Sequence, residues 1–285
     1  MRLIVVSGLS GAGKTIALQT LEDLDYYCID NLPVKLLQPL VQEILSREDG
    51  LFRNTVVGID VRNFMDELEN FPSVLADLQD SGLAVEILFL QASDNTLLKR
   101  YSDTRRKHPL SEDGVSLLEA IQEERRLLGA IAAHADLLID TSHTNVHQLR
   151  ELVRNRLHDT PLGALSILFE SFGFKHGIPA HGDFVFDVRC LPNPHWQPHL
   201  RALTGRDEAV VAFLEQQPEV KHMLADLQGF LETWIPCFDK GNRSYLTIAI
   251  GCTGGQHRSV YMAEALANHF RKARPHVMTR HRELG

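Results

Sequence analysis

The sequence lacks the features of secreted, membrane-spanning and zinc-binding proteins. Its first apolar run, Leu3–Val6, is too short for a signal peptide, and no stretch is long enough to span a membrane. The four cysteines are scattered and show no C-x-x-C spacing: Cys28, Cys190, Cys237 and Cys252. This distribution argues against a zinc site or a disulfide framework and favours a reducing compartment, so we expect a cytoplasmic protein without membrane partners.

Positive charge is also scarce. The 29 Lys and Arg residues face 37 Asp and Glu residues, which gives a formal net charge of -8. Nucleic-acid-binding proteins usually carry a basic balance, so any such role must depend on a local patch.

The length and composition predict two globular domains. A chain of 285 residues exceeds one ordinary domain, and 44% hydrophobic with 23% charged residues is typical of globular proteins. Proline and glycine interrupt the pattern between His158 and Gly163. We therefore expect domains at 1–158 and 163–285.

The stretch around which the first domain is organised fits the phosphate-loop pattern G-x-x-x-x-G-K-[ST]. It consists of Gly8, Leu9, Ser10, Gly11, Ala12, Gly13, Lys14 and Thr15. A short apolar strand precedes it and a helical pattern follows, so loop N–H groups and the helix N-terminus would cradle a polyphosphate. Lys14 would reach the β- and γ-phosphates, and the Thr15 hydroxyl would hold Mg²⁺. The alternative is a glycine-rich turn that binds nothing.

The apolar run Thr55–Ile59 ends in Asp60, which is the Walker B form. Asp60 would hold Mg²⁺ through water, so Lys14, Thr15 and Asp60 are the predicted catalytic set and Thr15 and Asp60 the metal-linked pair. The alternative is an ordinary aspartate at the end of a strand.

Strands and helices alternate throughout this half. The pattern predicts an α/β fold: an N-terminal P-loop kinase-like parallel sheet with helices on both faces, plus a second, smaller α/β domain. Three arginines, Arg100, Arg105 and Arg106, stand where small nucleotide kinases carry a lid that closes over phosphate. The alternative is a solvated basic loop.

A second strand–loop–helix site follows the apolar run Tyr245–Ile250. The loop Gly251–Ser259 contains C-x-x-x-x-x-R, the spacing of cysteine phosphatases. Its predicted phosphate-binding residues are Cys252, Thr253, Gly254, Gly255, His257 and Arg258. Gly251 replaces the usual preceding histidine and no general acid is identifiable, which favours binding of a phosphorylated metabolite without turnover. A phosphatase using Cys252 and Arg258, or a structural turn, are the alternatives.

A basic cluster closes the sequence. Its predicted RNA-contacting residues are Arg271, Lys272, Arg274, Arg280 and Arg282. Such a cluster can neutralise nucleic-acid phosphates, although a solvated helix terminus looks the same in sequence.

The chain resembles the RapZ family of RNase adapter proteins, which are P-loop nucleotide-binding proteins of bacteria. The resemblance is carried by Ser7–Thr15, Asp30–Pro33, Asp60–Asn63, Arg100–Leu110, Phe169–Pro179, Phe186–Trp196 and Asn242–Ser259. It implies ATP and GTP binding with weak hydrolysis. It places ATP on Gly8–Thr15 and assigns GTP to Asp60, Val61, Arg62 and Asn63.

The same resemblance implies a regulatory role for the second domain. It implicates that domain in binding small regulatory RNA, in delivering it to an endoribonuclease, and in sensing an amino-sugar phosphate that controls cell-envelope precursor synthesis. A homo-oligomer is expected. Members with the RNA role can carry a lysine-rich tail, which the sequence does not show at Arg282–Gly285. A small-metabolite kinase, supported by the lid-like arginines, is the alternative function.

Overall fold

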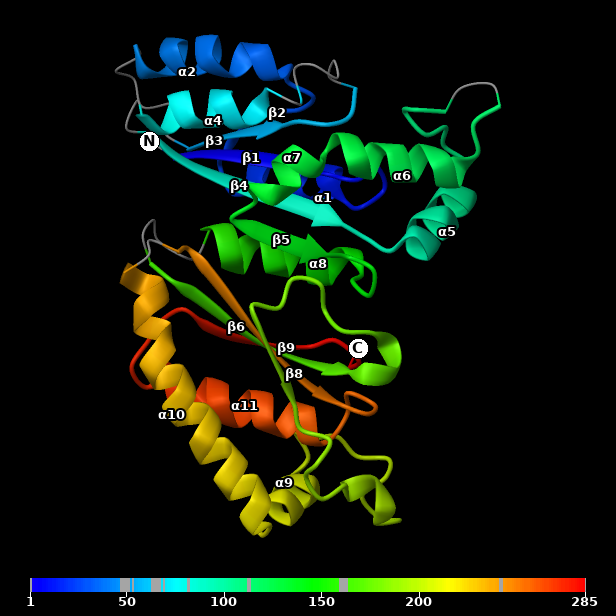
Figure 1. Ribbon diagram of the computed structural model, residues 1–285, viewed down its shortest axis with the longest axis vertical. Helices are drawn as coiled ribbons and strands as arrows, with labels where there is room; N and C mark the ends of the chain where they lie inside the picture. The colour runs from blue at the N-terminus through cyan, green and yellow to red at the C-terminus, as the bar shows by residue number, and fades with distance from the viewer. Residues whose placement is uncertain are drawn as a thin grey trace. The chain divides into compact units, whose positions relative to one another are not determined.

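The computed structural model describes residues 2–46, 52, 54–62, 68, 70–80, 83–111, 114–158, 164–240 and 243–284. The chain divides into two compact units, Met1–Asp159 and Thr160–Gly285. Figure 1 shows that each unit is built around its own sheet. Residues 159–163 of the expected linker at 158–163 lie outside the described residues.

The first unit contains a five-stranded parallel sheet of order β2-β3-β1-β4-β5. Its strands are β1 Arg2–Gly8, β2 Tyr27–Ile29, β3 Asn54–Gly58, β4 Ala84–Gln91 and β5 Leu137–Asp140. Every residue of β1 is buried. This explains why the central strand reads as a continuous apolar run rather than an alternating one.

Helices cover both faces of this sheet. One layer consists of α2 Leu37–Leu45, α4 Phe71–Asp80 and α7 Gly129–Ala133, and the other of α1 Lys14–Glu22 and α8 Val146–Val153. Two further helices, α5 Asp94–Thr104 and α6 Leu117–Leu127, pack against each other. Side-chain caps begin three of the helices: Ser93 on α5, Ser116 on α6 and Asn145 on α8.

The second unit contains a four-stranded parallel sheet of order β7-β8-β6-β9. Its strands are β6 Ser166–Gly173, β7 Phe184–Asp187, β8 Tyr245–Cys252 and β9 Val277–His281. Its helices are α9 Glu208–Glu215, α10 Pro218–Lys240 and α11 Arg258–Arg271. Their apolar side chains form one core with Phe169, Ile248 and Ile250 of the sheet. The predicted two-domain α/β fold is confirmed.

Two elements of the second unit differ from the sequence prediction. The stretch Ser171–Gly177, which is rich in glycine and aromatic residues, reads as a loop in the sequence, but strand β6 continues through Ser171 to Gly173. The basic stretch that begins at Arg271 includes a strand as well as the end of a helix, since 277–281 form the strand β9 beside β6. A strand with two charged or titratable residues in five gives a weak signal, because its partners on β6 lie far away in the sequence. Within the described ranges, no helix combines the length and apolar character needed to cross a bilayer.

Candidate functional site

The phosphate loop joins β1 to α1 at the carboxyl edge of the first sheet. Gly8, Gly11 and Gly13 have φ values of 140°, 87° and 109°, which only glycine adopts without strain. A Cβ at Gly8 would lie 2.1 Å from the carbonyl oxygen of Leu90, so the strand β4 would have to move. The backbone therefore requires these glycines to curl the loop around the start of α1.

Lys14 is held inside this loop. Its Nζ donates to the carbonyl oxygen of Gly8 at 2.6 Å. Burial lowers the pKa of Lys14, while the nearby carboxylates of Glu124 and Asp60 act in the opposite direction. The ammonium group is thus placed where a bound phosphate would replace the Gly8 carbonyl as its partner.

The predicted catalytic residues meet in one cavity of about 810 Å³. Lys14, Thr15 and Asp60 line it, together with the loop residues from Ser10 to Gly13. Gly8 and Leu9 do not belong to this lining. The cavity brings together the groups that bind a triphosphate and its metal ion.

Asp60 lies two residues beyond β3 and is 4% exposed. Its carboxylate accepts from the Arg62 backbone N–H at 2.9 Å, from Nε at 2.8 Å and from Nη2 at 2.5 Å. The Walker B carboxylate is therefore inside the cavity but paired with a cation of its own chain. Of the other residues assigned to GTP, Val61 packs into the core and Asn63 lies outside the described residues.

The three lid-like arginines have different positions. Arg100 donates to the carbonyl oxygens of Gly11 at 2.9 Å and Thr141 at 2.6 Å, so it fixes the phosphate loop to the end of β5. Arg105 ends α5 in a left-handed conformation with φ 52°. Arg100 and Arg106 both line the cavity, and so does Lys107, which the sequence did not single out.

Sequence reasoning also missed Glu124. This fully buried residue of α6 accepts hydrogen bonds from the backbone N–H and the hydroxyl of Ser10. Its only sequence signal is its place four residues beyond Ala120 on a capped helix, which does not distinguish it from a solvated glutamate. Its partner is 114 residues away in the chain.

The loop of the second unit is centred on Cys252, which is 3% exposed. The Gly255 N–H and the Ser259 hydroxyl both donate to Cys252 Sγ at 3.2 Å. Burial alone raises the pKa of the Cys252 thiol, but these hydrogen bonds and the charge of Arg258 outweigh it and hold the pKa below its usual value. The loop thus stabilises negative charge at its centre.

Arg258 is a buried support of this loop. Its Nη1 donates to the carbonyl oxygens of Arg189 at 2.7 Å and Leu191 at 3.0 Å, and Nη2 lies 3.4 Å from Thr253 Oγ1. Burial lowers the pKa of His257, whose Nε2 lies 3.2 Å from the Leu200 carbonyl oxygen. Both side chains therefore already have protein partners.

Two charged residues beside this loop were not predicted. The Lys175 side chain approaches the open side of Gly254, where an added Cβ would lie 4.0 Å from Nζ. Glu283 accepts from the Gly173 N–H at 3.0 Å, and its carboxylate blocks the side of Gly255. There is consequently room for an added atom at Gly254 beside Lys175, but not at Gly255.

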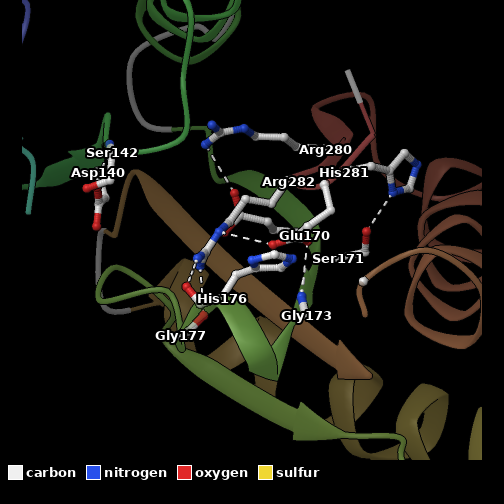
Figure 2. Close-up of polar contacts among 12 residues, drawn as sticks. Asp140, Ser142, Glu170, Ser171, Gly173, His176, Gly177, Arg280, His281 and Arg282 are labelled. Atoms are coloured by element: carbon white, nitrogen blue, oxygen red, sulfur yellow. Dashed lines mark hydrogen bonds and ion pairs between the residues drawn. The ribbon is translucent and has the colours of Figure 1, made fainter. Parts of the chain in front are cut away.

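The basic cluster is divided between two elements. Arg274, near the end of α11, pairs with Asp239 at 2.6 Å. Figure 2 shows the other group, in which Arg280 reaches Glu170 at 3.1 Å and Arg282 donates to the carbonyl oxygens of His176 and Gly177. Arg274 and Arg280 are thus both paired with carboxylates of the second unit.

Arg271 and Lys272 end α11. Arg271 Nε donates to the Val277 carbonyl oxygen at 3.2 Å, and both side chains are exposed. They are the exposed members of the predicted RNA cluster, whereas Arg274, Arg280 and Arg282 are half-buried.

The parallel sheet, the glycine loop at its carboxyl edge and the Lys14–Thr15–Asp60 cavity define a nucleotide-binding protein with a P-loop kinase-like fold. The RapZ-like N-terminal domain matches residues 1–160, and the RapZ C-terminal domain matches residues 165–285. The chain belongs to the RapZ family, as its sequence motifs predict.

The chain is also similar to relatives over its full length. The chain is 54% identical to a nucleotide-binding protein of Thioalkalivibrio sulfidiphilus, and the match covers 100% of both chains. It is 55% identical to a nucleotide-binding protein of Methylococcus capsulatus, covering 100% of this chain and 96% of that one.

Among solved structures, the chain is similar to shikimate kinase from Bacteroides thetaiotaomicron. The two are 18% identical with a TM-score of 0.34, and the match covers 53% of this chain and 94% of the kinase. Deoxyadenosine kinase from M. mycoides gives 14% identity and a TM-score of 0.34, covering 56% of this chain and 100% of that one.

Proposed function

We propose that the first unit binds ATP and GTP with Mg²⁺ and hydrolyses them slowly. The observation that carries this proposal is the single cavity that unites Lys14, Thr15 and Asp60. Thr15 and Asp60 would hold the metal ion, which would neutralise phosphate charge when bound. Slow hydrolysis is consistent with the pairing of Asp60 to Arg62, which metal water would have to replace.

The second unit is proposed to be regulatory. The family resemblance supports a cytoplasmic homo-oligomer that binds small regulatory RNA, presents it to an endoribonuclease and senses an amino-sugar phosphate. The loop around Cys252 supports the sensing part, because it favours negative charge and has room at Gly254 beside Lys175. The exposed end of α11 supports the RNA part.

Calorimetry tests the two ligand assignments separately. The parent protein should bind Mg-ATP and Mg-GTP, and phosphate release should be slow but dependent on Asp60. Glucosamine 6-phosphate should bind the second unit and lose affinity in Lys175→Ala, with Lys221→Ala on the surface of α10 as the matched control. Absence of nucleotide binding by the parent protein would refute the first assignment, and equal affinity in both lysine variants would refute the second.

The sensing proposal also predicts binding without turnover. Cys252→Ser should retain much of the sugar-phosphate affinity, because Ser259 and the loop backbone remain. Phosphate release that depends on Cys252 would favour the phosphatase instead. Sequencing RNA co-purified with the protein, with and without glucosamine 6-phosphate, tests the adapter role.

A small-metabolite kinase is the second candidate for the first unit. Arg106 and Lys107 on the cavity wall favour it, since such cations can hold an acceptor or a transferring phosphate. Transfer of γ-phosphate from labelled ATP to a metabolite extract, lost in Lys14→Ala, would support this candidate over the regulatory one.

A further inference from the structure

A chain of hydrogen bonds joins the phosphate loop to the segment that follows α5. The Ser10 backbone N–H donates to Glu124 Oε2 at 2.9 Å, and the Ser10 hydroxyl donates to Oε1 at 2.6 Å. Glu124 is fully buried, so both of its oxygens depend on protein donors. Its carboxylate is therefore bound to the phosphate loop itself.

The other partner of Glu124 is His108. The His108 Nε2 atom lies 3.1 Å from Glu124 Oε2, and the imidazole is 2% exposed. The Leu110 N–H donates to His108 Nδ1 at 3.1 Å, so Nδ1 is an acceptor and the proton of the neutral ring lies on Nε2. His108 consequently donates to Glu124, and three donors converge on one carboxylate.

The segment that His108 anchors carries two of the cations of the cavity wall. Arg106 and Lys107 directly precede His108 and line the cavity, whereas His108 is buried and does not belong to the lining. The Tyr101 ring, which also lines the cavity, lies 5.3 Å from the His108 ring. The position of these cations thus depends on a buried bond to the same carboxylate that holds Ser10.

A fully buried carboxylate is costly unless its donors are all present. If residue 124 only filled space in the core, an apolar side chain would do so without needing hydrogen-bond donors. The arrangement instead gives the phosphate loop and the basic segment one common hydrogen-bond acceptor, the Glu124 carboxylate. A displacement of one segment is therefore transmitted to the other through the Ser10–Glu124 and Glu124–His108 hydrogen bonds.

We propose that Glu124 and His108 are positioning residues that place Arg106 and Lys107 against the terminal phosphate, so that the site prefers a nucleoside triphosphate to a diphosphate. The proposal rests on nucleotide binding at the loop Gly8–Thr15. It assigns the preference to a buried link rather than to the phosphate loop alone, because the loop groups can serve a diphosphate as well.

The test compares affinities for Mg-ATP and Mg-ADP by calorimetry. His108→Leu should lower the affinity for ATP about tenfold, as expected for one charge-assisted hydrogen bond, and that for ADP about twofold or less. Glu124→Gln should also lower the affinity for ATP more than that for ADP, but with a larger loss for ADP, because it disturbs the Ser10 contact of the phosphate loop as well. His108→Gln should restore the preference, because its amide nitrogen can donate to Glu124. Glu123→Gln, on the same helix but paired at the surface with Arg126, is the matched control and should change neither affinity.

A double-mutant cycle separates positioning from general destabilisation. Arg106→Ala should itself lower the ATP-to-ADP preference, and in the His108→Leu background it should add little, since the two changes remove one interaction. If Glu124→Gln does not fold, the His108 and Arg106 variants decide the question. Equal losses for ATP and ADP, or additive effects in the cycle, would overturn the inference.

The parent protein distinguishes this inference from the proposed function. A parent that binds ATP and ADP equally well overturns the inference alone. A parent that binds neither overturns both.

Discussion

Replacing Lys14 by alanine is the most direct test of the phosphate loop. The side chain of Lys14 donates to the Gly8 carbonyl at 2.6 Å, and a bound phosphate would take over this hydrogen bond. A hydrogen bond to a charged group contributes about 1.5–3 kcal/mol, compared with about 1 kcal/mol for a neutral one. The parent protein gives up the Gly8 hydrogen bond when it gains the phosphate contact. The Lys14→Ala variant has neither, so its loss of affinity is the difference between the two.

Two phosphate contacts less the one Gly8 hydrogen bond that is given up correspond to a net loss of about 2–5 kcal/mol. Since 1.4 kcal/mol corresponds to a tenfold change, Mg-ATP affinity should fall about 30-fold to several thousand-fold. Hydrolysis should fall below detection, because the ammonium also stabilises charge that develops on the γ-phosphate.

Calorimetry with Mg-ATP measures this change. Lys99→Ala is the matched control, because Lys99 is an exposed lysine of α5 outside the cavity lining. Both variants should keep the thermal stability of the parent within a few degrees. An affinity of Lys14→Ala within twofold of the parent would refute the role of this residue and place the polyphosphate elsewhere.

Three further predictions follow from individual contacts. Asp60→Asn should keep the fold and lose Mg²⁺-dependent hydrolysis, so a parent-like rate over a Mg²⁺ titration would make Asp60 merely structural. Burial alone raises the pKa of Glu170, but His181, Arg280 and Arg282 outweigh it and hold the pKa at about 2. The ionised Glu170 therefore contributes about 3 kcal/mol at most to the free energy of unfolding above pH 4.5, and this contribution is lost as the pH falls toward 2. In Glu170→Gln the free energy of unfolding should accordingly depend less on pH between pH 4.5 and 2. RNA affinity should fall steeply with salt and be weakened by neutralising the exposed end of α11, so a salt-independent affinity would contradict the phosphate contacts.

Most of the first unit could be predicted because its signals are local. The phosphate loop is defined by eight consecutive residues, and the apolar runs that became β1, β3 and β4 need no tertiary information. The helix α6 was not identified, although Ser116 and Glu119 form a capping box at its start.

The roles of individual arginines could not be predicted in the same way. Arg100 and Arg258 have the right spacing to meet phosphate, but in the structure both donate to backbone carbonyls of distant segments. A guanidinium group fits either partner, and only the fold determines which one is within reach. Glu124 presents the opposite case, because nothing nearby in the sequence reveals that Ser10 and His108 converge on it.

The pairing of β6 has a consequence for how the protein is made. All eight residues of β6 are buried, and the strand pairs with β8 and β9, with Ser166 opposite Tyr245 and Ile167 opposite Val277. At roughly 5–20 residues per second, the ribosome needs on the order of ten seconds to supply both partners after β6 emerges. During that time an apolar strand has both edges open to other chains. Chains cut short within β9 should therefore accumulate as aggregates, and co-expressed chaperones should rescue the full chain but not the shortened one.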